Sequence, residues 1–297
     1  VGESSLLDGA PLGALMLGIA LLFSFHQLRK ASPEQAAPWE RQGLPVLAAL
    51  GLTFLYLLAP LFFFVQGTAI SWALAGLATL FIGLRIQSRT FLFSAFAVQL
   101  LGGALFLLRL QGAGEDSAAV FSAGWSGLLS ASLIGLALIA GMLLAARDDM
   151  VRSDVRLLRG LSVVLLAGLV LINLAVLFVL PWQTASAVWA ASGLLIIWLS
   201  LYLKQRVSFV FGLLLQVIGG AAFLLAGPEL LGPLSSEGLR PLAHGGFWTP
   251  LVLGLAAMIG AWRLQLGNHA SAFDALSVQR LSEVLLVWGA GWWALAW

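Results

Sequence analysis

Ten long apolar runs constrain the fold of this chain more than any other feature of its sequence. A helix needs about 20 apolar residues to cross the hydrocarbon core of a bilayer, and runs of that length recur along all 297 residues. The predicted spans are 10–28, 44–64, 68–84, 90–108, 122–146, 160–180, 184–203, 207–226, 247–266 and 280–297. These runs do not alternate between apolar and polar residues as the strands of a membrane barrel do. The sequence therefore predicts an all-α fold, a polytopic transmembrane helical bundle of about ten spans.

The composition excludes soluble enzymes and nucleic-acid-binding domains. Hydrophobic residues make up 61% of the chain and charged residues 9%, whereas a soluble domain carries about 25% charged residues. Cysteine is absent, which removes disulfides, thiol nucleophiles and thiolate metal sites. His26, His244 and His269 lie far apart and show no metal-ligand spacing. We therefore expect no metal, no cofactor and, with a net charge of +2, no nucleic-acid partner.

The basic residues fall on one side of the predicted membrane. If the ten spans are right, 13 of the 15 lie in loops of one side: Arg29, Lys30, Arg41, Arg85, Arg89, Arg147, Arg152, Arg156, Arg159, Lys204, Arg206, Arg263 and Arg280. Only Arg109 and Arg240 lie on the other side. Because loops rich in Lys and Arg stay in the cytoplasm, we expect a multi-pass protein of the bacterial inner membrane with cytoplasmic basic loops and an N-terminus outside.

An internal repeat appears when the chain is shifted by 117 residues. Matched pairs include Trp72 with Trp189, Gly76 with Gly193 and Gln99 with Gln216. At a shift of 119 the match continues, with 135–137 falling on 254–256. The repeated unit holds four spans, an even number, so the copies are predicted to be parallel tandem repeats related by an axis along the membrane normal.

The repeat divides the chain into four predicted parts. Residues 1–43 end a preceding repeat and include an inner loop, 44–147 and 148–266 form transmembrane repeats 1 and 2, and 267–297 begin a following repeat. The chain starts at Val1 rather than at Met, and Trp297 falls inside an apolar run. We therefore expect it to be part of a longer protein.

The repeated segments also carry a resemblance. Trp72-Ala73-Leu74-Ala75-Gly76 resembles the Trp-Ala-x-x-Gly signature of a bacterial predicted-membrane-protein family, catalogued as domain of unknown function 2339. Trp189 to Gly193 is similar again, and Ala75 and Ser192 stand where the family pattern often has an acidic residue. The resemblance implies many spans, repeated units and an inner-membrane location, and it supplies no established activity.

A Gln-x-x-Gly-Gly motif occurs once in each repeat, near the middle of a span. Its members are Gln99, Gly102 and Gly103, and then Gln216, Gly219 and Gly220. Positions i, i+3 and i+4 share one helix face, so this face combines an amide with two gaps for a neighbouring backbone. Two interpretations stay open, a polar lining for a substrate path and simple helix packing with the amide as an interhelical hydrogen-bonder.

Three further features have structural and functional interpretations. Trp72 with Gly76 and Trp189 with Gly193 begin their spans at the outer side, where anchoring of the indole at the interface competes with a ligand platform. Glu283 is the candidate intramembrane charge, either a cation site or a carboxylate paired near the inner surface. The inner loop 147–159 is a solvated segment or a contact for anionic lipid headgroups.

Three function classes follow from these features. The first is transport or flipping of an apolar or amphipathic envelope compound, which requires a cavity touching Gln99 or Gln216. The second is a structural or scaffolding membrane protein that binds membrane lipids or partner membrane proteins, which requires a packed interior. The third is a membrane enzyme, but the outer loops 109–122 and 227–246 contain no recognisable catalytic pattern. No catalytic residue is predicted.

Overall fold

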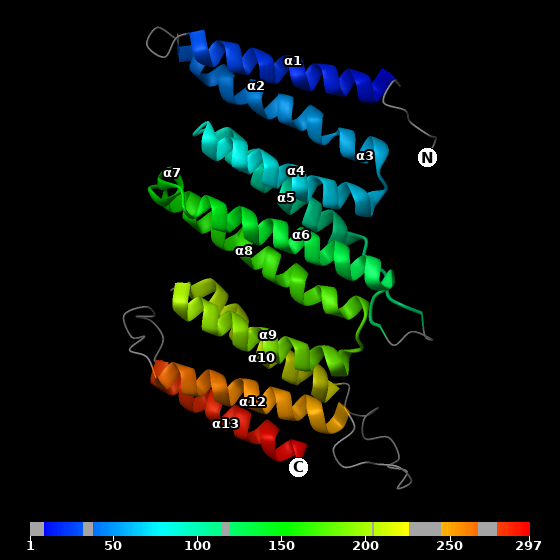
Figure 1. Cartoon of the computed structure of the whole chain (residues 1–297), viewed down its shortest axis with the longest axis vertical. Coiled ribbons are helices and arrows are strands. Elements are labelled where there is room, and N and C mark those ends of the chain that lie inside the picture. Colours follow the sequence, from blue (N-terminus) through cyan, green and yellow to red (C-terminus); the bar gives the residue numbers. More distant parts are fainter. Residues whose placement is uncertain (1–8, 32–37, 115–118, 204, 226–244, 267–277) are drawn as a thin grey trace. The chain divides into compact units, whose positions relative to one another are not determined.

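The computed structural model describes residues 9–31, 38–114, 119–203, 205–225, 245–266 and 278–297, and in these ranges regular structure is helical apart from one β-bridge between Gly112 and Phe121. The helices, labelled in Figure 1, are α1 (Gly9–Ala31), α2 (Pro38–Tyr56), α3 (Leu58–Phe62), α4 (Val65–Arg85), α5 (Arg89–Leu108), α6 (Gly124–Ala145), α7 (Asp149–Arg152), α8 (Val155–Ala175), the 3₁₀ turn η1 (Val176–Phe178), α9 (Trp182–Leu203), α10 (Arg206–Leu225), α12 (Gly245–Gln265) and α13 (Val278–Ala296).

Nine helical segments in the described part of the chain are long and apolar enough to cross a membrane, and they coincide with the first nine predicted spans. The tenth predicted span, 280–297, forms α13. It is not among the nine, because polar residues at its start, including Arg280 and Glu283, lower its mean hydropathy. The all-α, polytopic fold predicted from the sequence is confirmed.

Two of the predicted spans are not continuous α-helices. The span expected at 44–64 breaks after Tyr56, and the short helix α3 completes it. Pro60 explains the break, since proline has no N–H to donate to the carbonyl four residues earlier. The span expected at 160–180 tightens into the 3₁₀ turn η1 after Ala175. Each break therefore changes the backbone hydrogen bonding at the end of a span.

The chain divides into two compact units, each described by itself. Unit 1 comprises Val1–Leu110 and Leu129–Ile172, and unit 2 comprises Gln111–Leu128 and Asn173–Trp297. In unit 1, α1 packs on α2 and α4 packs on α5, while in unit 2 α9 packs on α10 and α12 packs on both α13 and α9. Antiparallel helix pairs are thus the common building block of both units (Figure 1).

A tight turn joins α4 to α5 and forces these two helices to lie side by side. The N–H of Ser88 donates to the Gly83 carbonyl at 3.0 Å, and the N–H of Gln87 donates to Leu84 at 3.3 Å. Gln87 takes the left-handed backbone conformation, with φ of 51°. These are the hydrogen bonds and the left-handed residue of a Schellman cap. In unit 2, the N–H of Gln205 likewise donates to the carbonyl of Ser200, five residues earlier, at 3.0 Å.

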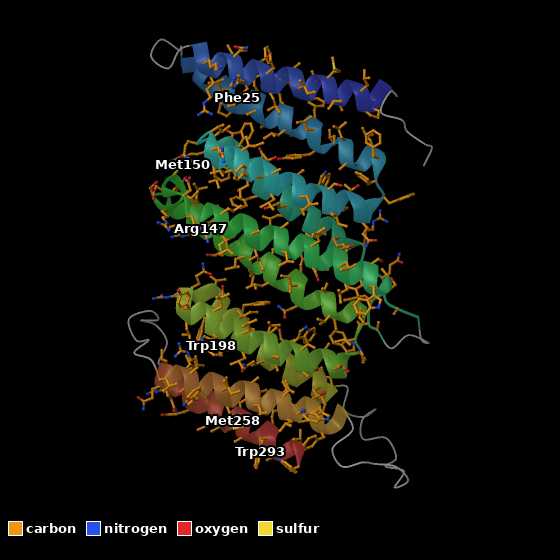
Figure 2. All side chains as sticks on the ribbon, viewed as in Figure 1. Phe25, Arg147, Met150, Trp198, Met258 and Trp293 are labelled. Atoms are coloured by element: carbon orange, nitrogen blue, oxygen red, sulfur yellow. The ribbon has the colours of Figure 1, made fainter. Side chains whose placement is uncertain are left out.

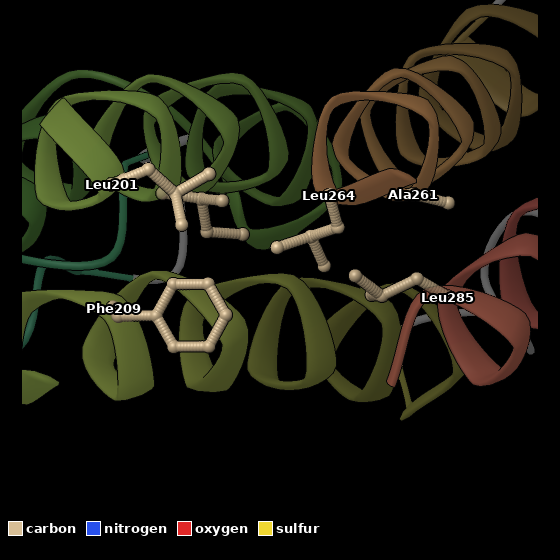
Figure 3. Close-up of a cluster of buried hydrophobic side chains, with 6 residues drawn as sticks. Leu201, Phe209, Ala261, Leu264 and Leu285 are labelled. Atoms are coloured by element: carbon tan, nitrogen blue, oxygen red, sulfur yellow. The ribbon is translucent and has the colours of Figure 1, made fainter. Parts of the chain in front are cut away.

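Each unit has a cluster of buried hydrophobic side chains between its helices. In unit 1 it contains Phe25, Ala48, Leu52 and Phe91. In unit 2, Figure 3 shows Leu201, Phe209, Leu264 and Leu285 converging from four different helices. The outward side chains are largely apolar as well (Figure 2), as a surface in contact with lipid requires.

Candidate functional site

Gln99, in the middle of α5, connects three helices of unit 1. Its side chain is 0% exposed. Its Nε2 donates to the Ala73 carbonyl of α4 at 3.2 Å and to the Ala137 carbonyl of α6 at 3.3 Å. Its Oε1 has no hydrogen-bond partner among the described residues. A Cβ added at Gly141 would lie 3.2 Å from this oxygen, so the amide fills the space that this glycine leaves.

The glycines of the same motif let α4 and α5 touch backbone to backbone. A Cβ added at Gly102 would lie 2.9 Å from the Ala69 carbonyl oxygen. A Cβ added at Gly76 would lie 2.9 Å from the Ala95 carbonyl oxygen and would overlap the Gln99 side chain. These positions therefore accept no side chain without separation of the two helices, and the face is a packing surface.

Gly103 belongs to the same motif and faces another helix. A Cβ added there would lie 3.2 Å from Leu171 Cδ1 of α8. The motif therefore holds α5 against α4 through Gly102 and against α8 through Gly103.

Unit 2 repeats this packing around Gln216, which is 1% exposed. A Cβ at Gly193 would lie 2.7 Å from the Gly212 carbonyl oxygen, and one at Gly219 would lie 3.0 Å from that of Ser186. A Cβ at Gly220 would lie 2.7 Å from the Trp288 ring of α13. The structure thus places the predicted residues of one motif together in the pair α4–α5 and those of the other in the pair α9–α10.

The amide of Gln216 differs from that of Gln99 in its hydrogen bonding. Neither its Nε2 nor its Oε1 has a partner among the described residues. A Cβ at Gly260, the counterpart of Gly141, would lie 3.9 Å from Nε2, so this glutamine is packed less tightly than Gln99. A buried amide without partners costs about 1–3 kcal/mol, and it is the least satisfied polar group of the motif.

The two repeated tryptophans hold the broken ends of the preceding spans. The indole N–H of Trp72 donates to the Tyr56 carbonyl at 2.8 Å. Pro60, four residues after Tyr56, has no N–H to donate to that carbonyl. The indole N–H of Trp189 donates to the Asn173 carbonyl at 2.7 Å, just before η1. Both indoles thus bond within the protein, and Trp189 is only 6% exposed.

Besides the contact of Gly193 with Gly212, sequence reasoning missed three further pairs of glycines that meet backbone to backbone. Gly18 meets Gly51 between α1 and α2, Gly135 meets Gly168 between α6 and α8, and Gly254 meets Gly289 between α12 and α13. In each pair, a Cβ on one glycine would lie 2.8 to 3.2 Å from the carbonyl oxygen of the other. The signal was present in the sequence, since Gly18 and Gly51 fall on Gly135 and Gly168 at the same shift of 117 residues. Met258 and Trp293, labelled in Figure 2, flank the third pair.

Glu283 lies on an exposed face of α13, one turn after Arg280. Its carboxylate accepts a hydrogen bond from Gln279 Nε2 at 3.4 Å. Arg280 and Glu283 both line one groove of 830 Å³ in unit 2, whose other walls are apolar side chains of α13 and Leu224 of α10. The predicted intramembrane charge is therefore at the end of a groove.

Two other sequence expectations concern metals and the outer loops. Among the described residues, no group of three or more His, Asp or Glu side chains is placed to hold a metal ion. Residues 227–244 of the loop 227–246, with His244, and also His269, lie outside the described residues. Beside the loop 109–122, a 490 Å³ pocket is lined mainly by small and aromatic residues, including Phe121, Trp125 of α6 and Phe178 of η1.

The comparisons with known proteins identify no relative of this chain. No family model, no curated protein and no solved structure matches it. By its own geometry the chain is a polytopic integral membrane protein with glycine-packed helix pairs.

Proposed function

We propose that this protein is a structural membrane protein, a packed helical scaffold that binds membrane lipids or partner membrane proteins. The carrying observation is the full burial of Gln99, whose amide N–H groups bond to the backbones of two neighbouring helices. A polar group that lined a path would be accessible from that path. The close glycine contacts on the same face also favour a packed interior.

The recurrence of equivalent contacts supports parallel tandem repeats as the architecture of this scaffold. Gly76 packs against Gln99 in unit 1 as Gly193 packs against Gln216 in unit 2. The resemblance of Trp72 to Gly76 to the family of domain of unknown function 2339 agrees with such an array. Together with the distribution of basic residues, it supports a location in the bacterial inner membrane, with the basic loops cytoplasmic and the N-terminus outside.

Native mass spectrometry of the protein, gently purified from its own membrane, tests the scaffold function. We expect retained protein subunits or phospholipids, and the same set on a variant with Gln99→Leu and Gln216→Leu that remains folded. A single stoichiometric small molecule that is present on the native protein and absent from the double variant would contradict the scaffold.

A second candidate function, transport of an apolar or amphipathic compound, is supported by Gln216. Its amide is 1% exposed in the middle of a span, and neither of its polar atoms has a hydrogen-bond partner among the described residues. A ligand that passes through unit 2 would satisfy them. In the same experiment this function requires that Gln216→Leu alone removes a bound compound while Gln99→Leu alone retains it.

A further inference from the structure

Gln99 and Gln216 occupy equivalent positions, yet only Gln99 bonds to its neighbouring helices directly. Its amide donates to one backbone carbonyl of α4 and to one of α6. At the repeat shifts of 117 and 119 residues, the counterparts of those carbonyls belong to Ala190 of α9 and Ala256 of α12. Both alanines are buried in one hydrophobic cluster. Unit 2 therefore has equivalent acceptors, but the amide of Gln216 has no partner among the described residues.

The two amides differ in the room that a neighbouring glycine leaves beside them. A Cβ added at Gly141 would lie 3.2 Å from Oε1 of Gln99, which is tighter than ordinary contact. A Cβ added at Gly260 would have Leu194 Cδ1 at 3.8 Å and Gln216 Nε2 at 3.9 Å as its nearest atoms, so a methyl group fits there in ordinary contact. A water molecule is smaller than a methyl group and therefore fits between Gly260 and the amide.

The surroundings of this space are also polar enough for water. A buried water molecule makes about two to four hydrogen bonds. An oxygen about 1 Å closer to Gln216 Nε2 than the added Cβ would accept a hydrogen bond of the usual length, about 2.9 Å. Gly260 follows Ala256 by four residues in α12, so the two residues share one face of the helix. The amide N–H and the Ala256 carbonyl are thus two partners for one water molecule.

Gln216 lies in the middle of α10, away from the ends of the helix. Along the chain, the nearest residues that the structure does not describe are 204 and 226. Both are ten or more residues away, which corresponds to about 15 Å or more of helix. A buried amide without a partner is costly, and an ordered water molecule is a usual partner for such a group.

We propose that Gln216 holds one buried water molecule, which accepts a hydrogen bond from Nε2 and donates to the carbonyls of Ala256 and Ala190. The water connects α10 to α12 and α9, as the amide of Gln99 connects α5 to α6 and α4 directly. This water site goes beyond the proposed scaffold function, which requires only a packed interior.

The test is nuclear magnetic resonance of the whole chain in detergent micelles, with glutamine labelled with ¹⁵N. Cross-peaks between side-chain amide protons and water are recorded in the rotating frame, where direct contact and chemical exchange give opposite signs. Gln99→Leu and Gln216→Leu assign the two signals. We expect a direct-contact cross-peak for Gln216 and none for Gln99, which serves as the internal control because it is equally buried.

Gly260→Ala tests where the water lies. The added methyl group fits without a clash, so the variant is expected to melt within a few degrees of the native protein and to lose the Gln216 cross-peak. The matched control is Gly160→Ala in α8, an exposed helical glycine whose added Cβ would meet nothing within 4 Å. This control is expected to retain the cross-peak.

Four results would overturn the water site. They are a native protein without a direct-contact cross-peak for Gln216, an equal cross-peak for Gln99, a cross-peak that persists in folded Gly260→Ala, and an equal loss in Gly160→Ala. The first two are read from the native protein and do not depend on the folding of a glycine variant.

Discussion

Gly168→Ala adds one methyl group where α6 and α8 come closest, and its cost can be worked out from the contacts. A Cβ at Gly168 would lie 2.8 Å from Ile139 Cγ1 and 2.9 Å from the Gly135 carbonyl oxygen. Ordinary contact begins at 3.4 Å, and a backbone oxygen cannot rotate away, so the helices must separate by about 0.5 Å. Such a gap removes about a quarter of the dispersion energy of each contact that it opens. We expect a loss of about 1–3 kcal/mol in the free energy of unfolding.

The assay is reversible unfolding of the purified protein in sodium dodecyl sulfate, followed by tryptophan fluorescence. Gly160→Ala is the matched control, since it lies on the same helix, is exposed, and its Cβ would meet nothing within 4 Å. We expect the control to change the free energy of unfolding by less than about 0.5 kcal/mol. If both substitutions cost the same, the glycine contact does not hold these helices together and the reasoning is refuted.

The remaining predictions use the same assay. Gln99→Leu is expected to lower the free energy of unfolding by about 0.6–2 kcal/mol because it removes two interhelical hydrogen bonds. Gln216→Leu is expected to leave the free energy of unfolding unchanged or to raise it, because this amide has no hydrogen-bond partner among the described residues. A larger loss in Gln216→Leu than in Gln99→Leu would contradict the two hydrogen-bond patterns. Trp189→Phe is expected to cost about 1 kcal/mol through the lost bond to Asn173, and Trp125→Phe, at a 69% exposed position, much less. Asp154→Asn is expected to lower the free energy of unfolding by less than about 1 kcal/mol at low salt and to have no effect at high salt. The reason is that its partner Arg89 is 3.7 Å away and its side chain is 63% exposed. A larger loss that does not depend on salt would show that this pair is not a surface ion pair.

The spans were predictable because each depends on a local property of the chain. A run such as 90–108 is apolar over the thickness of a bilayer whatever its neighbours are, and the structure places α5 at Arg89–Leu108. The exceptions are also local. Pro60 was visible in the sequence, and the break that it causes after Tyr56 follows from its missing N–H. The turn residue Gln87 gave no such signal, because glycine is the usual residue in the left-handed conformation that it adopts.

The candidate site was predictable as a set of residues but not as a set of contacts. The shift of 117 residues identified Gln99 and Gln216 as equivalent positions, yet one amide bonds to two backbones and the other to none among the described residues. The two surroundings also differ in tightness, since an added Cβ would lie 3.2 Å from the Gln99 amide at Gly141 and 3.9 Å from the Gln216 amide at Gly260. These distances depend on the rotation and crossing of a neighbouring helix, which no local pattern encodes.

The sequence by itself determined that the chain is an all-α membrane protein, where its spans lie and which residues recur. These properties follow from transfer of apolar side chains into lipid, an effect that adds up residue by residue along the chain. Only the tertiary structure decided which glycines meet, that the indoles of Trp72 and Trp189 hold the broken ends of the preceding spans, and that α10 and α13 leave a groove with a charged end. Those features arise from close packing between helices, where a few tenths of an ångström decide whether two groups bond, clash or leave a gap.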